Sequence, residues 1–123
     1  MMTYPPLGRL DVAQAGDATV ARLSVDRSWT QEAVGALGAE LTRLAGPPGC
    51  RLVLDLSRVE FFPSLLLGQL VALHKKVRSG GGFLVLSGLS PQVALVLERT
   101  RLERIFTICR DEEEALRALR DAG

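Results

Sequence analysis

The sequence predicts an α/β domain with a mixed, mainly parallel sheet and covering helices. Short apolar segments of strand type alternate with longer segments whose apolar residues recur at helical spacing. This alternation follows an initial hairpin pattern, and strands alternating with helices are typical of parallel sheets covered by helices. With 123 residues, the chain has the length of one hydrophobic core. We therefore expect a single domain over residues 1–123, with an ordered core from about residue 8 to about residue 120.

The N-terminal part predicts a hairpin followed by a helix. Apolar residues at 10–12 and 20–25 flank Ala15-Gly16-Asp17, whose glycine and aspartate favour a tight turn. Ser28 followed by Gln31 fits a capping box. The apolar residues that then share one helical face predict a helix from about Thr30 to Ala45. They are Val34, Leu37, Leu41 and Leu44.

The middle of the chain predicts a buried strand and a second helix. Residues 46–49, GPPG, form a connecting loop, because proline and glycine do not continue a helix. The apolar run from Arg51 to Leu56 predicts a central strand, with Asp55 near its carboxyl end. Pro63 suits a helix start, and a broad apolar stripe predicts a helix over residues 64–78. Residues 79–82, SGGG, end it before a strand over residues 83–86.

The C-terminal part predicts two further helices around a short last strand. Ser90 and Pro91 form a cap and first position for a third helix. Apolar residues from 102 to 108 lead through the strand. Asp111 and Glu114 form a capping box for a last helix. The residues of this helix expected to face the body of the domain are Ala115, Leu116 and Leu119.

Composition narrows the classes of function. Hydrophobic residues make up 47% and charged residues 24%, as in soluble globular proteins. The formal charge of +1 gives no field that would attract nucleic acid or an anionic membrane. The N-terminus lacks the pattern of a secretory signal, and the apolar runs are far shorter than a membrane span, so we expect a cytoplasmic protein. Cys50 and Cys109 lack metal-ligand spacing and are expected to be buried, reduced thiols.

The segment from Leu52 to Leu70, LVLDLSRVEFFPSLLLGQL, resembles the signature region of the STAS domain family. In that region an apolar strand ending in DLS precedes a Val-x-Phe and a helix start of DSSGL type. The similarity continues over residues 73–93 and 98–116. Within this family, the segment resembles the anti-sigma factor antagonists. This resemblance implies a STAS-like fold and a regulatory, protein-binding role in the control of transcription, with no cofactor and no catalysis.

The resemblance also implies a site. In these antagonists the serine after the motif aspartate is phosphorylated by an anti-sigma factor with kinase activity, and Ser64 occupies the matching position. Three positions depart from the motif: Pro63 replaces the aspartate, Leu65 the second small residue and Leu66 the glycine. We expect a partner-binding surface centred on this segment. Its candidate residues are Phe62, Pro63, Ser64, Leu65, Leu66 and Gly68.

The physical chemistry of a helix start is compatible with such a switch. A phosphate on Ser64 would face free N–H groups and the positive end of the helix dipole, and its charge would repel a docked partner. The structural alternative is that Ser64 only caps the helix. Because successive helical side chains are about 100° apart, residues 65–67 cannot all point into the core. Because successive side chains of an extended segment point to opposite sides, we expect the ring of either Phe61 or Phe62 to lie near the surface.

Two other functions within the family are compatible with the sequence. A STAS subunit that docks on the ATPase of an ABC lipid transporter, or a STAS domain that senses a small molecule, would have the same fold. A receiver-like phosphoacceptor or an enzyme at Asp55 is disfavoured, because only isolated Asp11 and Asp17 accompany the first strands. Residues 79–82 lack the lysine of a phosphate-binding loop. The basic residues at 74–78 fit a solvated helix face, and the single histidine, His74, has no metal-ligand partner.

Overall fold

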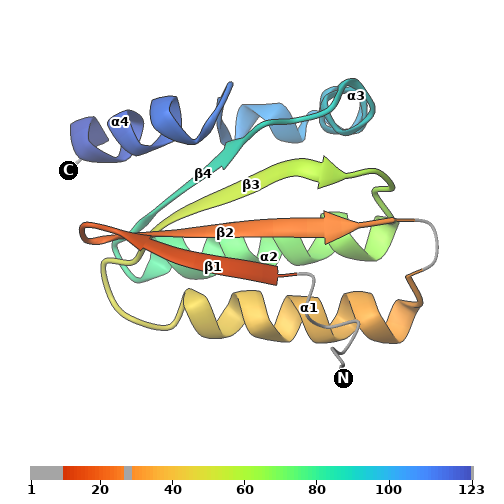
Figure 1. Cartoon of the computed structure of the whole chain (residues 1–123), viewed down its shortest axis with the longest axis horizontal. Coiled ribbons are helices and arrows are strands. Elements are labelled where there is room, and N and C mark those ends of the chain that lie inside the picture. Colours follow the sequence, from red (N-terminus) through yellow and green to blue (C-terminus); the bar gives the residue numbers. More distant parts are fainter. Residues whose placement is uncertain (1–9, 27–28, 123) are drawn as a thin grey trace.

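A mixed five-stranded sheet organises the chain, of which the computed structural model describes residues 10–26 and 29–122. The strands lie side by side in sequence order (Figure 1). They are β1 (Leu10–Ala15), β2 (Ala18–Val25), β3 (Arg51–Val59), β4 (Phe83–Ser87) and β5 (Thr107–Cys109). The β1–β2 pair is antiparallel and the other three pairs are parallel. The predicted α/β class, with a mainly parallel sheet after an N-terminal hairpin, is confirmed.

The hairpin turn lies where the sequence places it. Ala15 pairs with Ala18, and Gly16 between them has a φ of 67°, which is the left-handed region that glycine adopts without steric cost. Residue 8, the expected start of the ordered core, lies outside the described residues.

Four α-helices complete the fold: α1 (Gln31–Leu44), α2 (Ser64–Ser79), α3 (Pro91–Arg99) and α4 (Glu112–Ala122), with a short 3₁₀ turn, η2 (Leu102–Arg104), before β5. The expected bounds of α1 and α2 agree with the structure within one residue. Thr30 caps α1, since its hydroxyl accepts a hydrogen bond from the Ala33 amide at 3.0 Å. The prediction that Ser28 opens a capping box was therefore wrong about the cap, and Ser28 itself lies outside the described residues.

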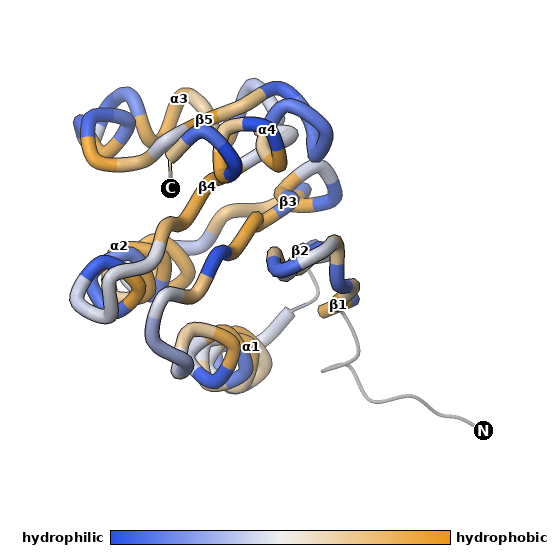
Figure 2. Tube along the Cα trace, turned by 90° about the vertical axis from the view of Figure 1, so that its left-hand side faces the viewer, coloured by the Kyte–Doolittle hydropathy of each residue, from blue (hydrophilic) through white to orange (hydrophobic). Residues whose placement is uncertain are grey.

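The sheet is covered on both faces. α1 and α2 lie on one face and α4 lies on the other (Figure 1). On β3, Leu52, Leu54 and Leu56 pack with the α1–α2 layer, whereas Val53 packs with Ala115 and Leu119 of α4. Figure 2 shows that β3 and β4, between these layers, consist largely of hydrophobic residues. Burial on both faces explains why β3 reads as a continuous apolar run.

Strand β3 is longer than the sequence predicts. It extends to Val59, which is buried and pairs with Val25 of β2, so Asp55 lies in mid-strand and not near the carboxyl end. The apolar pattern did not predict this extension, because the exposed polar residues Ser57 and Arg58 interrupt it. The β2–β3 register shifts between Arg22 and Ser24, which marks a bulge.

Two capping predictions for the later helices are confirmed. The Ser90 hydroxyl accepts from the Val93 amide at 3.3 Å, with Pro91 as the first residue of α3. The Asp111 carboxylate accepts from the Glu114 amide at 2.8 Å, and the Glu114 carboxylate accepts from the Arg110 amide at 2.9 Å. Ala115 and Leu119 of α4 are buried and Leu116 is half-buried, as expected for its inner face.

The glycines after α2 bring two connections into contact. The Gly49 amide donates to the Gly80 carbonyl at 2.8 Å, and Gly81 has a φ of 81°. A Cβ on Gly82 would lie 2.1 Å from the Cys50 carbonyl oxygen and 2.8 Å from the Cys50 nitrogen. Only a residue without a side chain fits there, because both obstructing atoms belong to the backbone.

We predict that Gly82→Ala lowers the free energy of unfolding by about 2 kcal/mol or more, since the start of β3 or of β4 would have to move. Gly80→Ala is the matched control, because a Cβ there meets no atom closer than 3.7 Å. Its effect should stay within about 0.5 kcal/mol. Urea unfolding of both variants measures the difference, and equal midpoints would contradict the close backbone packing.

Candidate protein-interaction site

The loop between β3 and α2 is anchored to the end of β2. The Glu60 and Phe61 amides both donate to the Val25 carbonyl, at 2.8 Å and 3.3 Å. Val25 is the last residue of β2, so these bonds hold the loop at the carboxyl edge of the parallel strands. In open α/β sheets this edge is where functional groups gather.

The first turn of α2 has unpaired backbone donors. Pro63 is the N-cap, with φ −69° and ψ 154°, and its carbonyl accepts from the Leu66 and Leu67 amides at 3.0 Å and 3.2 Å. Ser64 is the first helical residue, so the alternative that Ser64 is the cap was wrong. Within the described residues, the Ser64 and Leu65 amides and the Ser64 hydroxyl form no hydrogen bond. This turn contains no acidic residue.

The three leucines at the start of α2 differ in exposure. Leu65 is 42% exposed, Leu67 is half-buried and Leu66 is fully buried in the core. Leu66 was wrongly placed among the surface candidates, because it lies on the same inner face of α2 as Leu70. Gly68 is exposed, and a Cβ there would meet no atom within 4 Å.

The two phenylalanines before the helix differ in exposure. Phe62 is half-buried and packs against the core, whereas Phe61 is 41% exposed. Phe61 therefore replaces Phe62 as the aromatic contact candidate. We call the exposed group here the Ser64 surface. It consists of the exposed Phe61, Ser64, Leu65 and Gly68 together with the half-buried N-cap residue Pro63.

The Ser64 surface rests on a fixed support. The Gln69 side chain donates to the Val34 carbonyl of α1 at 2.9 Å. Gly38 allows this close approach, because a Cβ there would lie 2.3 Å from the Gln69 amide nitrogen. The two helices therefore pack closely just beyond the first turn of α2.

A second polar group, which the sequence did not reveal, joins β2 to α4. The Arg22 guanidinium donates two hydrogen bonds to the Glu112 carboxylate, at 2.6 Å and 2.8 Å, and lies 3.6 Å from Asp11. Hydrogen bonding to the Glu112 carboxylate and the negative charge of that carboxylate raise the pKa of Arg22. These partners are 90 residues apart, so no local spacing could indicate the pair.

Asp55 belongs to the same polar group. Its carboxylate accepts from the Ser57 amide at 2.9 Å, two residues further along β3. Burial raises the pKa of Asp55, but hydrogen bonding with Glu112 and Ser57 and the charge of Arg22 lower it overall. The hydrogen-bonded contact between Arg22 and Glu112 connects β2 to the start of α4.

The basic residues of α2 do not form one solvated face as predicted. Lys75, Lys76 and Arg78 are exposed, but His74 is half-buried and meets the Phe106 ring edge-on, with 5.3 Å between ring centroids. Burial lowers the pKa of His74, and the charge of Arg78 lowers it further. The Arg78 guanidinium lies over the Phe83 ring at 5.1 Å.

The two cysteines are free thiols, as predicted, but only Cys109 is buried. Cys50 is half-buried, and its S–H group donates to the Leu44 carbonyl at 3.3 Å. Burial raises the pKa of both thiols, and the nearby carboxylates of Glu114 and Asp111 add to this at Cys109. Neither thiol has the low pKa of a reactive cysteine. Within residues 10–26 and 29–122, no helix combines the length and apolarity needed to cross a bilayer.

Comparison with known proteins gives consistent results. The model of the STAS domain family matches residues 13–115. An anti-sigma-factor antagonist (STAS) domain protein from Planctomyces limnophilus has a similar structure, with 23% identity, a TM-score of 0.79, and coverage of 89% of this chain and 97% of that one.

Two further solved structures are similar. An anti-sigma factor antagonist from Mycobacterium paratuberculosis is 27% identical, with a TM-score of 0.70 and coverage of 90% of this chain and 92% of that one. The Bacillus cell fate determinant SpoIIAA in its phosphorylated form is 18% identical, with a TM-score of 0.67 and coverage of 89% and 97%. Because the family model spans most of the sequence, this chain belongs to the STAS domain family.

Proposed function

We propose that this protein is an anti-sigma factor antagonist that binds an anti-sigma factor through the Ser64 surface and is released when Ser64 is phosphorylated. The observation that carries the proposal is the position of Ser64, an exposed hydroxyl on the first turn of α2 beside two amides without hydrogen-bond partners among the described residues. A kinase can reach such a hydroxyl without unfolding the domain.

The first turn of α2 can accommodate a phosphate. Its unpaired Ser64 and Leu65 amides point along the helix axis at the positive end of the dipole, and an anion there gains about 0.3–1 kcal/mol. The absence of an acidic side chain from this turn removes one source of repulsion. Phosphorylation should therefore leave the fold intact and act on the complex.

The rest of the surface supports an apolar protein contact. Leu65 and Phe61 are both exposed by about two fifths and lie on either side of Ser64 in the sequence. The open space at Gly68 lets a partner approach the helix one turn later. A phosphate in such a contact would add a charge of about −1.5 to −2. Binding would weaken, because this charge would be desolvated in the interface or repelled by the partner.

The departures from the family motif leave this geometry in place. Pro63, in place of the aspartate, supplies the extended conformation at the N-cap and leaves the neighbouring amides free. Leu65, in place of a small residue, adds apolar area to the exposed side of the turn. The similar structures include proteins described as anti-sigma factor antagonists and a SpoIIAA structure described as phosphorylated, which supports both parts of the proposal.

The proposal gives the protein a binding role and no catalytic one, acting in the cytoplasm where sigma factors work. The carboxylates at Asp55 and Glu112 hold Arg22 and Ser57 and are committed to the fold. A serine nucleophile needs a general base at its hydroxyl. Within the described residues, no histidine or lysine hydrogen-bonds to the Ser64 hydroxyl.

We expect Ser64→Glu to weaken binding to the cognate anti-sigma factor by about tenfold or more, because it places a negative charge in the contact. Ser64→Ala should bind within about twofold of the wild type and should no longer accept phosphate. Ser79→Glu adds the same charge at the other end of α2 and is the control. Isothermal titration calorimetry measures the dissociation constants. Unchanged affinity of a folded Ser64→Glu variant would exclude the switch.

We also expect Leu65→Ala to reduce affinity for the anti-sigma factor by about tenfold, the usual effect of truncating an apolar anchor worth 1–2 kcal/mol. Its thermal midpoint should hardly change, because the side chain is already partly in water. Leu95→Ala is the control, since Leu95 is 44% exposed on a different helix, α3. If both truncations weaken binding equally, the contact is not centred on the Ser64 surface.

A further inference from the structure

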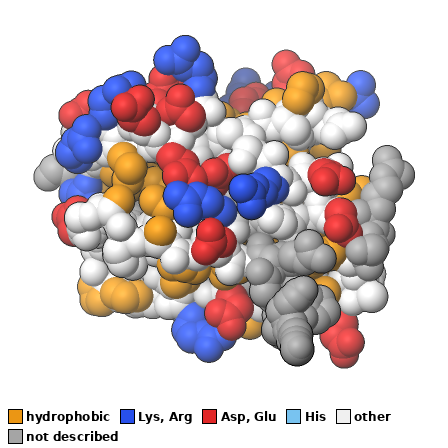
Figure 3. All heavy atoms as spheres, viewed as in Figure 1, with side chains coloured by type: hydrophobic (Ala, Val, Ile, Leu, Met, Phe, Trp, Pro, Cys, Tyr) orange, Lys and Arg blue, Asp and Glu red, His pale blue; other side chains and the backbone are white. Residues whose placement is uncertain are grey.

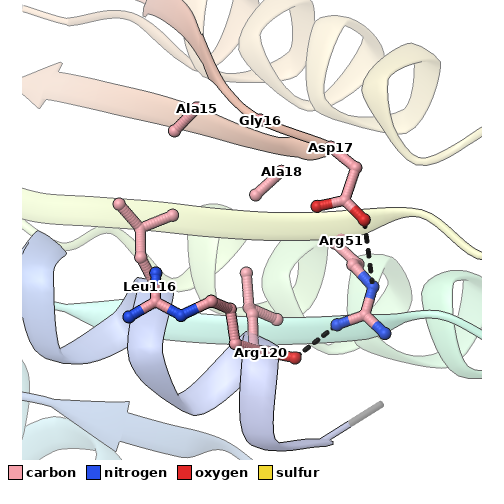
Figure 4. Close-up of a pocket in the computed structure, with 8 residues that line it drawn as sticks. Ala15, Gly16, Asp17, Ala18, Arg51, Leu116 and Arg120 are labelled. Atoms are coloured by element: carbon pink, nitrogen blue, oxygen red, sulfur yellow. Dashed lines mark hydrogen bonds and ion pairs between the residues drawn. The ribbon is translucent and has the colours of Figure 1, made fainter.

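A groove of about 680 Å³ lies between the β1–β2 turn and the C-terminal half of α4. Figure 4 shows the turn on one side and the helix on the other, with Arg51 from the start of β3 between them. Its lining residues are Ala15, Gly16, Asp17, Ala18, Arg51, Leu116, Leu119 and Arg120. The groove is at the amino edge of the parallel strands, the opposite end of the sheet from Ser64.

Arg51 is held in a fixed position at one end of the groove. Its guanidinium donates to the Leu119 carbonyl, and its Nε lies 4.0 Å from the Asp17 carboxylate (Figure 4). The side chain is 22% exposed and lies over the Phe83 ring at 5.8 Å. A guanidinium has five N–H donors, so these contacts do not use all of them.

Arg120 supplies a second cation. It is exposed, and within the described residues it forms neither a hydrogen bond nor an ion pair. Figure 4 shows its guanidinium alongside Leu116 at the groove wall. The lining contains two guanidinium groups and a single carboxylate, Asp17, whose side chain is 90% exposed. The groove therefore attracts anions.

The remaining walls are apolar. Ala18 and Leu119 are buried and form the floor, while Ala15 and Leu116 are partly exposed along the sides. The two alanines carry single methyl groups, which leave the space that larger strand residues would fill. Apolar walls with a few convergent polar groups are typical of sites for small organic ligands.

We propose that this groove binds a small organic carboxylate with an apolar chain. The exposed Arg120 side chain holds the carboxylate, the positive charge of Arg51 at the other end of the groove adds to the attraction, and the chain lies along Leu116, Leu119 and the two alanines. The ligand contacts both the β1–β2 turn and α4, so its binding stabilises the native state by mass action. This site is independent of the Ser64 surface and adds a small-molecule ligand to the protein's partners.

The test uses octanoate as the probe, with octylamine as a cation of equal chain length. Octanoate should shift the backbone amide resonances of residues 15–18 and 116–120 in a titration to about 10 mM, a range that detects even millimolar affinity. Octylamine should leave them unchanged. Arg120→Gln should weaken octanoate binding roughly fivefold, as expected for an exposed charge pair.

Arg117→Gln is the matched control, because Arg117 is exposed on the same helix, loses the same charge and does not line the groove. It should change the octanoate affinity by less than about twofold. Three results would each overturn the proposal: no shift with octanoate, equal shifts with octylamine, or equal losses in the two arginine variants. Binding of the anti-sigma factor is measured separately, so failure here does not bear on the Ser64 surface.

Discussion

Strand β3 is paired along both edges, with β2 and with β4, and buried on both faces, and this placement determines where the rest of the domain lies. The parallel pairs require crossovers, and each crossover returns its helix from the carboxyl edge to the amino edge of the sheet. α2 must therefore begin at the carboxyl edge. The two amides that donate to the Val25 carbonyl hold the loop there, and Ser64 follows it.

Most of the fold was predictable because its signals are local. The hairpin turn and the caps at Ser90 and Asp111 each act through residues within four positions of one another. The end of β3 was missed because Val59 is in the strand through its pairing with Val25, a contact across the sheet that apolar patterning does not contain.

The candidate site was predictable in position and less so in detail. Resemblance located Ser64, but which neighbours reach the surface depends on the rotation of α2 and the path of the preceding loop. These buried Leu66 and exposed Phe61. The contact of Arg22 with Glu112 and the ring contact of His74 depend on tertiary packing between distant segments, which a single sequence does not specify.

The helix turns at the two edges of the sheet carry side chains of different charge. The last turns of α1, α2 and α4 carry arginine or lysine and meet at the amino edge, whereas the first turn of α4 carries three glutamates. Such placement complements the helix dipoles. In Figure 3, acidic and basic side chains lie close together over much of the visible face, in keeping with a formal charge of +1. Recognition by this protein therefore depends on local surfaces and not on a global field.

Our main proposal is that the Ser64 surface binds an anti-sigma factor and that phosphate on Ser64 controls the complex. It is tested most directly by affinity purification of the protein from its native cells, with mass spectrometry of the co-purified proteins and of Ser64. We expect an anti-sigma factor with kinase activity bound to the protein without phosphate, and phosphate on Ser64 in the unbound fraction. Recovery of a transporter ATPase, with Ser64 unmodified in both fractions, would contradict it.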